Sequence, residues 1–416
     1  MTKKYIALSV ALCAFACGCK AIPFTNLFNP YDILLFKPQK SPHCFGFDIA
    51  YEGAFHSQAF RANPNDRVLE PDLYNEYGEQ DIQEAFSRKA PVLDIWQDEQ
   101  MLNTPTEFGI VNGDLHVPLN LMLTAYLSFP HNVYFGMYLP IYSMQLNNVR
   151  WAMAPDSITG QTIDAALNKL EATGRFDLRS DRKRFGIGDL AALVWWIRNY
   201  PQAKEWLKNV HIAIRAGFTF PTGKPQDFDL LFALPFGYDA GAGFLAGGNF
   251  ELGFGRHIRL GIDAEFLNLF GSQKMRRAKV ALGETDLTFT TKALTQLDPG
   301  FLQHYTIYTT FAHLLNGLSV TGAYQHTRQH ESKIFFDSSQ YDSRLANGYV
   351  RNNMLLSGQE SLQDWTAHSI IGMVDYDPCV RSAAVSPRFS LFLKYGFNGK
   401  RCISFNTVGC QVSLNF

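Results

Sequence analysis

Residues 115–142, LHVPLNLMLTAYLSFPHNVYFGMYLPIY, contain two ribbons of alternating side chains that decide the fold. Before the turn at 130–132 the odd positions are apolar, and the even positions between them include His116, Asn120 and Thr124. After the turn the odd positions are apolar again, and the even positions hold Tyr, Gly and Pro. A helix would scatter these apolar residues over its surface, whereas a strand places all of them on one side. The stretch therefore predicts two antiparallel strands, each apolar on one face.

The same period-2 pattern recurs along most of the chain. The strong segments are 45–55, 210–220, 258–266 and 408–416, and the weaker ones are 190–196, 244–254, 301–311, 318–324, 365–376 and 389–397. Strands of roughly 10 residues that are apolar on one face suit a transmembrane β-barrel, in which every backbone group is paired within the bilayer. Strands of a soluble sandwich are usually shorter, about 5–6 residues. The predicted fold class is therefore all-β, a closed antiparallel transmembrane β-barrel.

The links between these segments alternate between short and long. Short links lie at 130–132, 199–206, 255–257, 314–317 and 377–384, and long links lie at 57–113, 147–183, 222–241, 271–299 and 328–363. Short periplasmic turns and long extracellular loops are typical of outer-membrane barrels, and the count comes to about 12 strands. A count of 14 stays open because residues 231–238 and 280–291 alternate as well. Residues 81–88 and 162–173 predict short helical patches within the long extracellular loops.

The N-terminus has the layout of a secretory signal peptide, because Lys3 and Lys4 precede an uncharged apolar stretch that ends in small residues. We predict a signal peptide over residues 1–16, and leave open a later cleavage at 18–21 and lipidation at Cys17 or Cys19. Residues 22–42 then form an N-terminal periplasmic or plug segment, and residues 43–416 form the barrel. The expected location is the cell outer membrane.

The composition excludes several classes of protein. With 37 Lys+Arg against 38 Asp+Glu and no basic run, the chain lacks the clustered positive charge that nucleic-acid binding requires, so no nucleic acid is expected as a partner. A mean hydropathy of −0.11 argues against a bundle of membrane helices. The cysteines beyond the N-terminus form no C-x-x-C pair and no spacing with His that is typical of zinc. No cofactor and no metal are expected.

If the apolar faces meet lipid, the residues between them line the lumen. The lumen-lining candidates are charged, His and Tyr residues of those inner faces: Asp48, Glu52, His116, Tyr134, Tyr138, Tyr142, His211, Arg215, Glu251, Arg259, Asp263, Glu265, Arg388 and Lys394. Two interpretations stay open. The charges pair with one another and hold the lumen together, or some of them form a ligand passage with the three tyrosines. Trp195, Trp196 and Trp365 fall near predicted strand ends, which predicts a place in an interfacial aromatic belt.

Three features resemble Gram-negative outer-membrane barrels as a class: the signal peptide, the amphipathic strands and a terminal strand with Val412, Leu414 and Phe416 on its apolar face. This terminal strand looks like the C-terminal signal that the barrel-assembly machinery reads, and the resemblance implies that machinery as a partner. Two shorter stretches, GIGDL at 186–190 and FPTGK at 220–224, are similar to the FadL-like transporters of hydrophobic compounds. In that family an N-terminal segment plugs the barrel, which the resemblance implies for residues 22–42.

The expected function is that of an outer-membrane channel or passive transporter for small solutes, hydrophobic ones included. Outer-membrane lipid and the small-molecule solute are the other expected partners. One alternative is a surface-exposed adhesin or binding protein that the barrel anchors. A second is a barrel phospholipid hydrolase, for which four histidines between 313 and 368 lie near Ser319 and Ser369. The sequence contains no Gly-x-Ser-x-Gly elbow, so we assign no catalytic residue and expect no enzyme.

Overall fold

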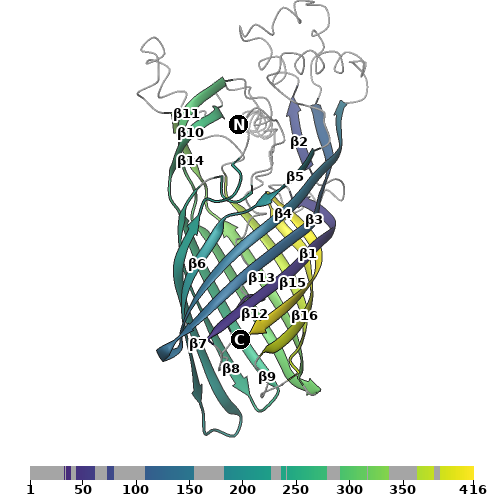
Figure 1. Ribbon diagram of the computed structural model, residues 1–416. Coiled ribbons are helices and arrows are strands. Elements are labelled where there is room, and N and C mark those ends of the chain that lie inside the picture. The colour runs from purple at the N-terminus through teal and green to yellow at the C-terminus, as the bar shows by residue number, and fades with distance from the viewer. Residues whose placement is uncertain are drawn as a thin grey trace, which may run out of the picture.

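The fold is a closed barrel of 12 antiparallel strands, which confirms the predicted fold class (Figure 1). The computed structural model describes residues 32, 34–38, 44–60, 73–78, 108–153, 182–225, 236–239, 241–278, 291–315, 317–336, 363–378 and 385–416. In order around the wall the strands are β1 (Phe45–Phe60), β3 (Phe108–Phe129), β4 (Val133–Met153), β6 (Leu190–Pro201), β7 (Leu207–Phe220), β8 (Gly243–Phe254), β9 (Ile258–Leu269), β12 (Leu302–Leu315), β13 (Leu318–Gln329), β15 (Trp365–Tyr376), β16 (Ser386–Lys400) and β17 (Cys402–Asn415).

The barrel closes between its first and last strands, because β1 pairs with both β3 and β17. At one end of this seam the N–H of Phe45 donates to the carbonyl of Phe416 at 3.3 Å, and the N–H of Phe416 donates to the carbonyl of Phe45 at 2.8 Å. Closure pairs the backbone groups that an open sheet would leave at its edges. We call the end that carries the short links and Phe416 the turn end, and the opposite end the loop end.

Five further strands lie beyond the barrel wall at the loop end (Figure 1). β2 (Leu73–Gly78) pairs with β3 and β5 (Arg182–Ile187) pairs with β4, while β10 (Ser272–Ala278), β11 (Thr291–Asp298) and β14 (Lys333–Phe336) form a separate three-stranded sheet. The wall has 12 strands rather than 14: the described strands after β9 and β13 pair with one another and not with the barrel, and most of the two stretches that left 14 open, 231–238 and 280–291, lies outside the described residues. The predicted helical patches at 81–88 and 162–173 lie outside the described residues. Among the described residues, none belongs to a helix long and apolar enough to span a membrane.

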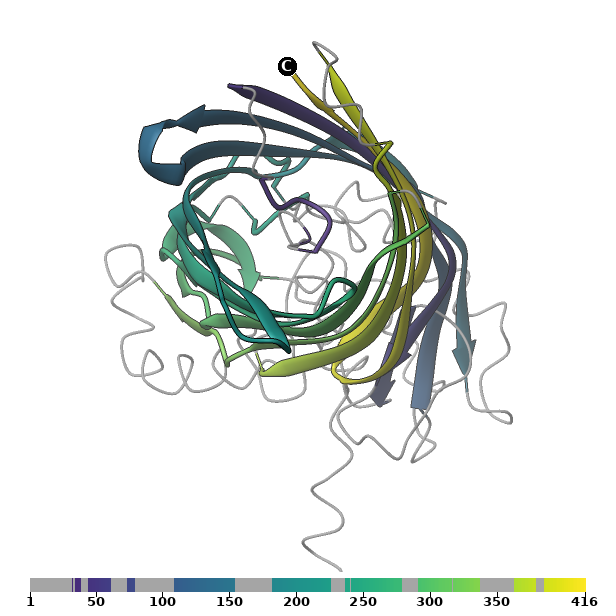
Figure 2. The same ribbon diagram turned by 90° about the horizontal axis from the view of Figure 1, so that it is seen from below.

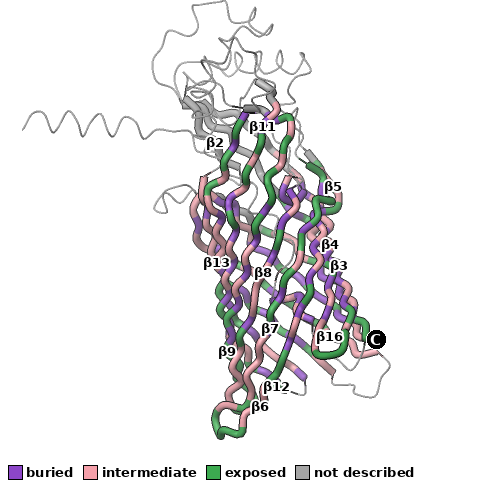
Figure 3. The backbone as a smooth tube through the Cα atoms, turned by 90° about the vertical axis from the view of Figure 1, so that its left-hand side faces the viewer, coloured by how far each residue is buried: buried purple, intermediate pink, exposed green. Residues whose placement is uncertain are grey.

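Side chains of the barrel strands alternate between an exposed outer face and a buried inner face (Figure 3). The exposed side chains are largely apolar: Leu391 is 65% exposed and Ile262 is 55% exposed, whereas Asp263 beside it is 0% exposed. This arrangement inverts that of a water-soluble protein, because apolar groups cover the outside and charged groups lie inside. Burying the outer groups in lipid contributes roughly 25 cal/mol for each Å² of apolar surface. The structure is that of a transmembrane barrel.

One expected lumen residue lies on the other face. The register of β3 against β4 shifts between His116 and Leu119, and a β-bulge there reverses the alternation. His116 is exposed, and its neighbour Val117 is buried at 8% exposure. The prediction for His116 was wrong because it assumed that the alternation continues without interruption past Pro118. Proline has no N–H to donate to a neighbouring strand, and the register shifts at this position.

Candidate functional site

A short N-terminal piece lies inside the barrel, where the view along its axis shows a purple segment enclosed by the wall (Figure 2). We call Asp32 and residues 34–38 the lumen segment. At its centre Phe36 is 3% exposed, and its carbonyl accepts hydrogen bonds from two wall tyrosines. The hydroxyl of Tyr126 donates over 2.8 Å and that of Tyr138 over 3.3 Å. Two donors on one carbonyl satisfy the backbone group that the segment buries.

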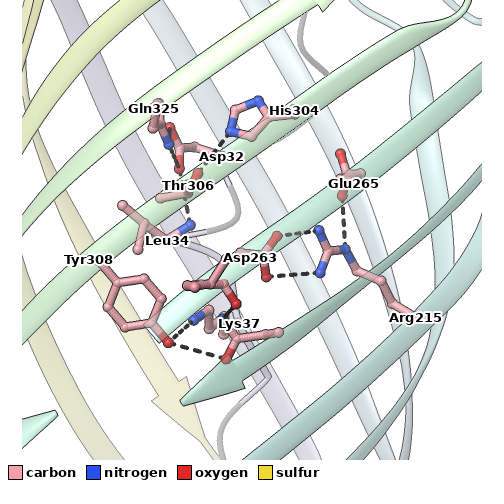
Figure 4. Close-up of polar contacts among 12 residues, drawn as sticks. Asp32, Leu34, Lys37, Arg215, Asp263, Glu265, His304, Thr306, Tyr308 and Gln325 are labelled. Carbon is pink, nitrogen blue, oxygen red and sulfur yellow. Dashed lines mark hydrogen bonds and ion pairs between the residues drawn. The ribbon is translucent and has the colours of Figure 1, made fainter. Parts of the chain in front are cut away.

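Each end of the lumen segment carries one charge that meets the wall (Figure 4). The carboxylate of Asp32 accepts from Gln325 Nε2 at 3.1 Å and lies 3.4 Å from Lys394 Nζ. The ammonium of Lys37 donates to Tyr308 Oη over 2.9 Å and lies 4.3 Å from the centre of the same ring. These contacts reach β12, β13 and β16, which lie close together in the wall, whereas the two tyrosines that donate to Phe36 lie on β3 and β4, so the segment is tethered to two parts of the wall.

A buried ionic group stands beside this segment. The Arg215 guanidinium donates to Asp263 Oδ1 at 2.7 Å and to Glu265 Oε2 at 2.8 Å, and both side chains of the Arg215–Asp263 pair are 0% exposed. Arg215 also lies 5.1 Å from the Trp195 ring centre, and Trp195 Nε1 donates to Tyr138 Oη over 3.0 Å. Ion pairs, one cation–π contact and two hydrogen bonds therefore link β9, β7, β6 and β4 in series to the lumen segment.

The tryptophan prediction was wrong for two of its three members. Trp195 is 0% exposed and Trp365 is 2% exposed, and both point into the lumen rather than to an interfacial belt. Trp365 Nε1 donates to Gln329 Oε1 over 2.8 Å. Trp195 and Trp196 are neighbours on one strand and must face opposite sides, so a single role for both was impossible.

The structure places every lumen candidate except His116 on the inner face. Most of those that carry a charge meet a partner there. Glu52 accepts from Asn120 Nδ2 at 2.9 Å and from Thr407 Oγ1, Glu251 accepts from Tyr308 Oη at 2.8 Å, and Arg388 Nη2 lies 2.9 Å from Asp375 Oδ1. His211 Nδ1 is 2.6 Å from Asn199 Oδ1. Charges pair with one another, as in the first interpretation, between Arg215 and the carboxylates of Asp263 and Glu265 and between Arg259 and Glu251, whereas Glu52 and His211 contact neutral side chains.

Several functional residues escaped the sequence reasoning. Asp32, His304, Tyr308, Gln325 and Asp375 all face the lumen, yet none stood out as a candidate. On β12 both faces carry aromatic and polar residues, so hydropathy does not say which one is inside. For His304 and Tyr308, the signal that could have found them is the pairing of β12 with β9, because the clear apolar alternation of β9 assigns the inner face of its neighbour.

The lumen segment separates two cavities. The upper cavity, toward the loop end, measures about 180 Å³ and is lined by apolar and aromatic groups such as Met122, Tyr142, Met144 and Trp365, together with the charged side chains of Asp32, Glu52 and Lys394. The lower cavity, toward the turn end, measures about 530 Å³ and has a charged lining that includes Lys208, His211, Glu251, Arg259, Asp375 and Arg388. Leu35 contacts both. A solute crossing the barrel would therefore pass from a chamber richer in apolar side chains, past this segment, into a more polar one.

The two short stretches singled out in the sequence meet at the roof of the upper cavity. Asp189, between β5 and β6, accepts hydrogen bonds from the N–H groups of Gly223 at 3.0 Å and Tyr238 at 2.6 Å. The Thr222 hydroxyl donates to the carbonyl of Gly188 at 2.7 Å. Gly223 is required here, because a Cβ would lie 1.6 Å from the carbonyl oxygen of Phe236. This contact holds Phe236 and Tyr238, both buried, over the lumen.

The Ser and His residues considered for hydrolysis do not form an activated pair. The Ser319 hydroxyl accepts from the backbone N–H of His313, and the Ser369 hydroxyl lies 3.5 Å from Gln325 Oε1. The His368 ring lies on the outer face, where its Nδ1 is 2.7 Å from Tyr324 Oη. Within the described part of the chain, no group of three or more His, Cys, Asp or Glu residues is arranged to hold a metal ion.

No family model matches the chain, and no curated protein matches its sequence. Among solved structures, similarity is found to an outer membrane channel from Pseudomonas putida F1, with a TM-score of 0.47, 10% identity and coverage of 92% of this chain and 100% of that chain. A FadL homologue of Pseudomonas aeruginosa has a TM-score of 0.26 and 8% identity over 89% of each chain. The toluene transporter TbuX of Ralstonia pickettii has a TM-score of 0.26 and 10% identity, over 90% of this chain and 89% of that chain. By its own strand pairing the chain is a closed β-barrel of the outer-membrane type.

Proposed function

We propose that the protein is a passive transporter of the cell outer membrane that lets small, mainly apolar solutes pass the lumen segment. The observation that carries this proposal is the division of one lumen into an upper cavity in which apolar and aromatic side chains predominate and a lower cavity in which polar and charged side chains predominate, with Leu35 in both linings. The free energy of an apolar solute falls when Met, Phe and Trp side chains replace the water around it. The charged lower cavity offers no comparable gain, so the solute is released toward the turn end.

The lumen segment restricts the passage of ions in this proposal. It is held by side-chain contacts, from Tyr126, Tyr138, Gln325, Tyr308 and Lys394, and not by strand pairing. A net gain of about 1 kcal/mol for each such hydrogen bond makes displacement of the segment accessible on a biological timescale. The resemblance to FadL-like transporters supports the same placement of an N-terminal plug.

Recordings in planar lipid bilayers and uptake into proteoliposomes test the proposal together. Wild-type protein should show low ionic conductance and measurable uptake of a small aromatic hydrocarbon. A variant in which residues 34–38 are replaced by Gly and Ser should conduct ions more strongly, because the polar lower cavity then opens to the upper one. Equal conductance of the two proteins and absence of hydrocarbon uptake would contradict transport, and would favour the barrel-anchored binding protein instead.

The end of the chain suggests how the barrel reaches its membrane. Val412 is exposed on the outer face of β17, Leu414 is half-buried on the same face, and Phe416, the residue directly after β17, is exposed. We propose that the barrel-assembly machinery recognises this terminal strand before it pairs with β1. Removal of Phe416 should lower the amount of heat-modifiable, folded barrel in the outer membrane while leaving synthesis and export unchanged.

A further inference from the structure

The outer surface of four adjacent strands, β12, β13, β15 and β16, changes its chemistry in steps toward the loop end. Cross-strand pairing aligns their outward residues in rows. The row nearest the middle is Ile307, Tyr324, Ile370 and Tyr395; the next is Tyr305, His326, His368 and Asn398; the last is Gln303, Arg328, Thr366 and Lys400. Toward the loop end, the outer face thus changes from a row of isoleucine and tyrosine, to a row with two histidines, and then to a row with two cations.

Side chains of the second row, which contains His326 and His368, contact one another. The rings of His326 and His368 have centroids 4.8 Å apart, and the ring of Tyr305 stacks on His326 with an interplanar angle of 19°. The Tyr324 hydroxyl bonds to Nδ1 of His368 at 2.7 Å. Polar ring nitrogens on a lipid-facing surface are suited to the depth where acyl chains give way to headgroups.

The last row concentrates positive charge around one acidic group. Arg328, Lys400 and Arg401 lie 3.8, 2.9 and 3.4 Å from the carboxylate of Asp364. Burial would raise the pKa of Asp364, but the hydrogen bond from Lys400 and the three positive charges hold that pKa below its usual value. The net charge of this group, three cations and one carboxylate, is therefore +2. The Nε atoms of Arg328 and Arg401 are buried without a hydrogen-bond partner.

The ligand that fits such a face carries phosphates and several acyl chains. Cations at the headgroup level of a membrane protein attract lipid phosphates, and a guanidinium binds them with two parallel hydrogen bonds. Arg328, Lys400 and Arg401 converge on one carboxylate, and the two positive charges that it leaves uncompensated favour a headgroup with two phosphates. Closer to the middle of the barrel, the exposed side chains of Ile307, Ile370, Leu393, Phe311 and Leu391 offer an apolar surface for acyl chains.

We propose that the outer face of β12, β13, β15 and β16 binds one lipopolysaccharide molecule, with its phosphates on Arg328, Lys400 and Arg401 and its acyl chains on the apolar rows. This site is separate from the lumen. It depends on the barrel spanning the outer membrane with its loop end outward, and it does not depend on transport. Its failure is therefore distinguishable from the failure of the proposed passage of solutes.

Purified barrels in detergent test the site directly with three probes: lipid A with two phosphates, dephosphorylated lipid A, and phosphatidylglycerol. Native mass spectrometry should show one lipid A bound to the wild type. In the R328Q/K400Q/R401Q variant the apparent Kd should rise by about tenfold or more, because each lost charge-assisted contact weakens binding by up to that factor. Dephosphorylated lipid A and phosphatidylglycerol should bind the wild type as weakly as lipid A binds the variant.

The matched control is Arg198→Gln. Arg198 is exposed on β6 near the turn end, where its guanidinium lies 5.0 Å from the Tyr200 ring centre, so it carries the same charge at the opposite membrane boundary. Its replacement should leave lipid A binding unchanged. Wild-type affinity in the triple variant, equal binding of phosphatidylglycerol, or an equal loss in R198Q would each overturn the proposal. If the triple variant does not show a heat-modifiable band, Arg328→Gln alone provides the test, since Lys400 and Arg401 then still hold Asp364.

Discussion

Lys394 Nζ on β16 lies 3.4 Å from Oδ2 of Asp32, although 362 residues separate the two in the chain. This contact joins the lumen segment to the wall at the boundary of the upper cavity, which both residues line. The carboxylate of Asp32 also accepts two hydrogen bonds from Gln325 and one from the backbone N–H of Leu34. One wall lysine therefore helps to hold the piece of chain that divides the lumen.

Replacing Lys394 with Met should loosen the lumen segment. Removing one partner leaves a desolvated carboxylate, a loss of about 1–3 kcal/mol. Single-channel recordings should show more frequent openings than wild type. Lys208→Met removes a charge from the lower cavity lining and should leave the opening frequency unchanged. An Asp32→Asn/Lys394→Met cycle should give a coupling energy well above zero, and strict additivity would show that the pair does not act together.

Replacing Arg215 with Leu should destabilise the whole barrel. The substitution leaves two carboxylates, on Asp263 and Glu265, buried without their cation, a loss of about 3–5 kcal/mol. Urea unfolding in lipid vesicles, followed by tryptophan fluorescence, measures the change. Arg259→Gln is the control: its side chain is 46% exposed and lies 3.9 Å from Glu251, so the loss should stay below about 1 kcal/mol. Similar losses in both variants would contradict the assigned role of the buried group.

Replacing Gly223 with Ala should displace the roof of the upper cavity. The added methyl group would lie 1.6 Å from a backbone oxygen of Phe236, which no side-chain rotation can relieve. Hydrocarbon uptake should change while the barrel stays folded, as judged by heat-modifiable mobility in gels. Gly372→Ala on β15 adds the same methyl group where nothing lies within 4 Å, and should have no effect on uptake. Identical uptake by G223A and wild type would show that the roof does not limit passage.

Stability should depend on pH through Asp189. Burial raises the pKa of Asp189 to about 6, although the N–H groups of Tyr238 and Gly223 act in the opposite direction. Between pH 3.8 and about 6 the folded protein holds a proton that the unfolded chain has released, so this group's contribution to stability falls as pH rises through that window.

Asp189→Asn removes the ionisable carboxyl group and should therefore remove this dependence of stability on pH. The difference in urea midpoint between wild type and D189N should therefore change between pH 4 and pH 6.5 and become flat above about pH 7. A difference that is constant across this range would show that Asp189 keeps an ordinary pKa.

The strands and their faces were readable from the sequence because alternation is local. A lipid-facing residue at Val408 or Ile262 requires an inward neighbour, and that rule needs no knowledge of the partner strand. The closed barrel followed from the length of these runs and from the alternation of short and long links. The alternation of short and long links also predicted about 12 strands, which the structure confirms, although alternation within residues 231–238 and 280–291 had left 14 open.

What the side chains meet was decided only by the tertiary structure. The contact of Asp32 with Lys394, the meeting of Asp189 with Gly223 and the row from Arg328 to Lys400 all depend on which strands become neighbours and in which register. A single bulge reversed the face of His116. Register and closure are set by the free energy of the whole wall, and one residue of slip moves every side chain to the other face. The sequence alone therefore determined what the barrel shows to lipid, and the packed barrel determined what its residues do inside and along the rim.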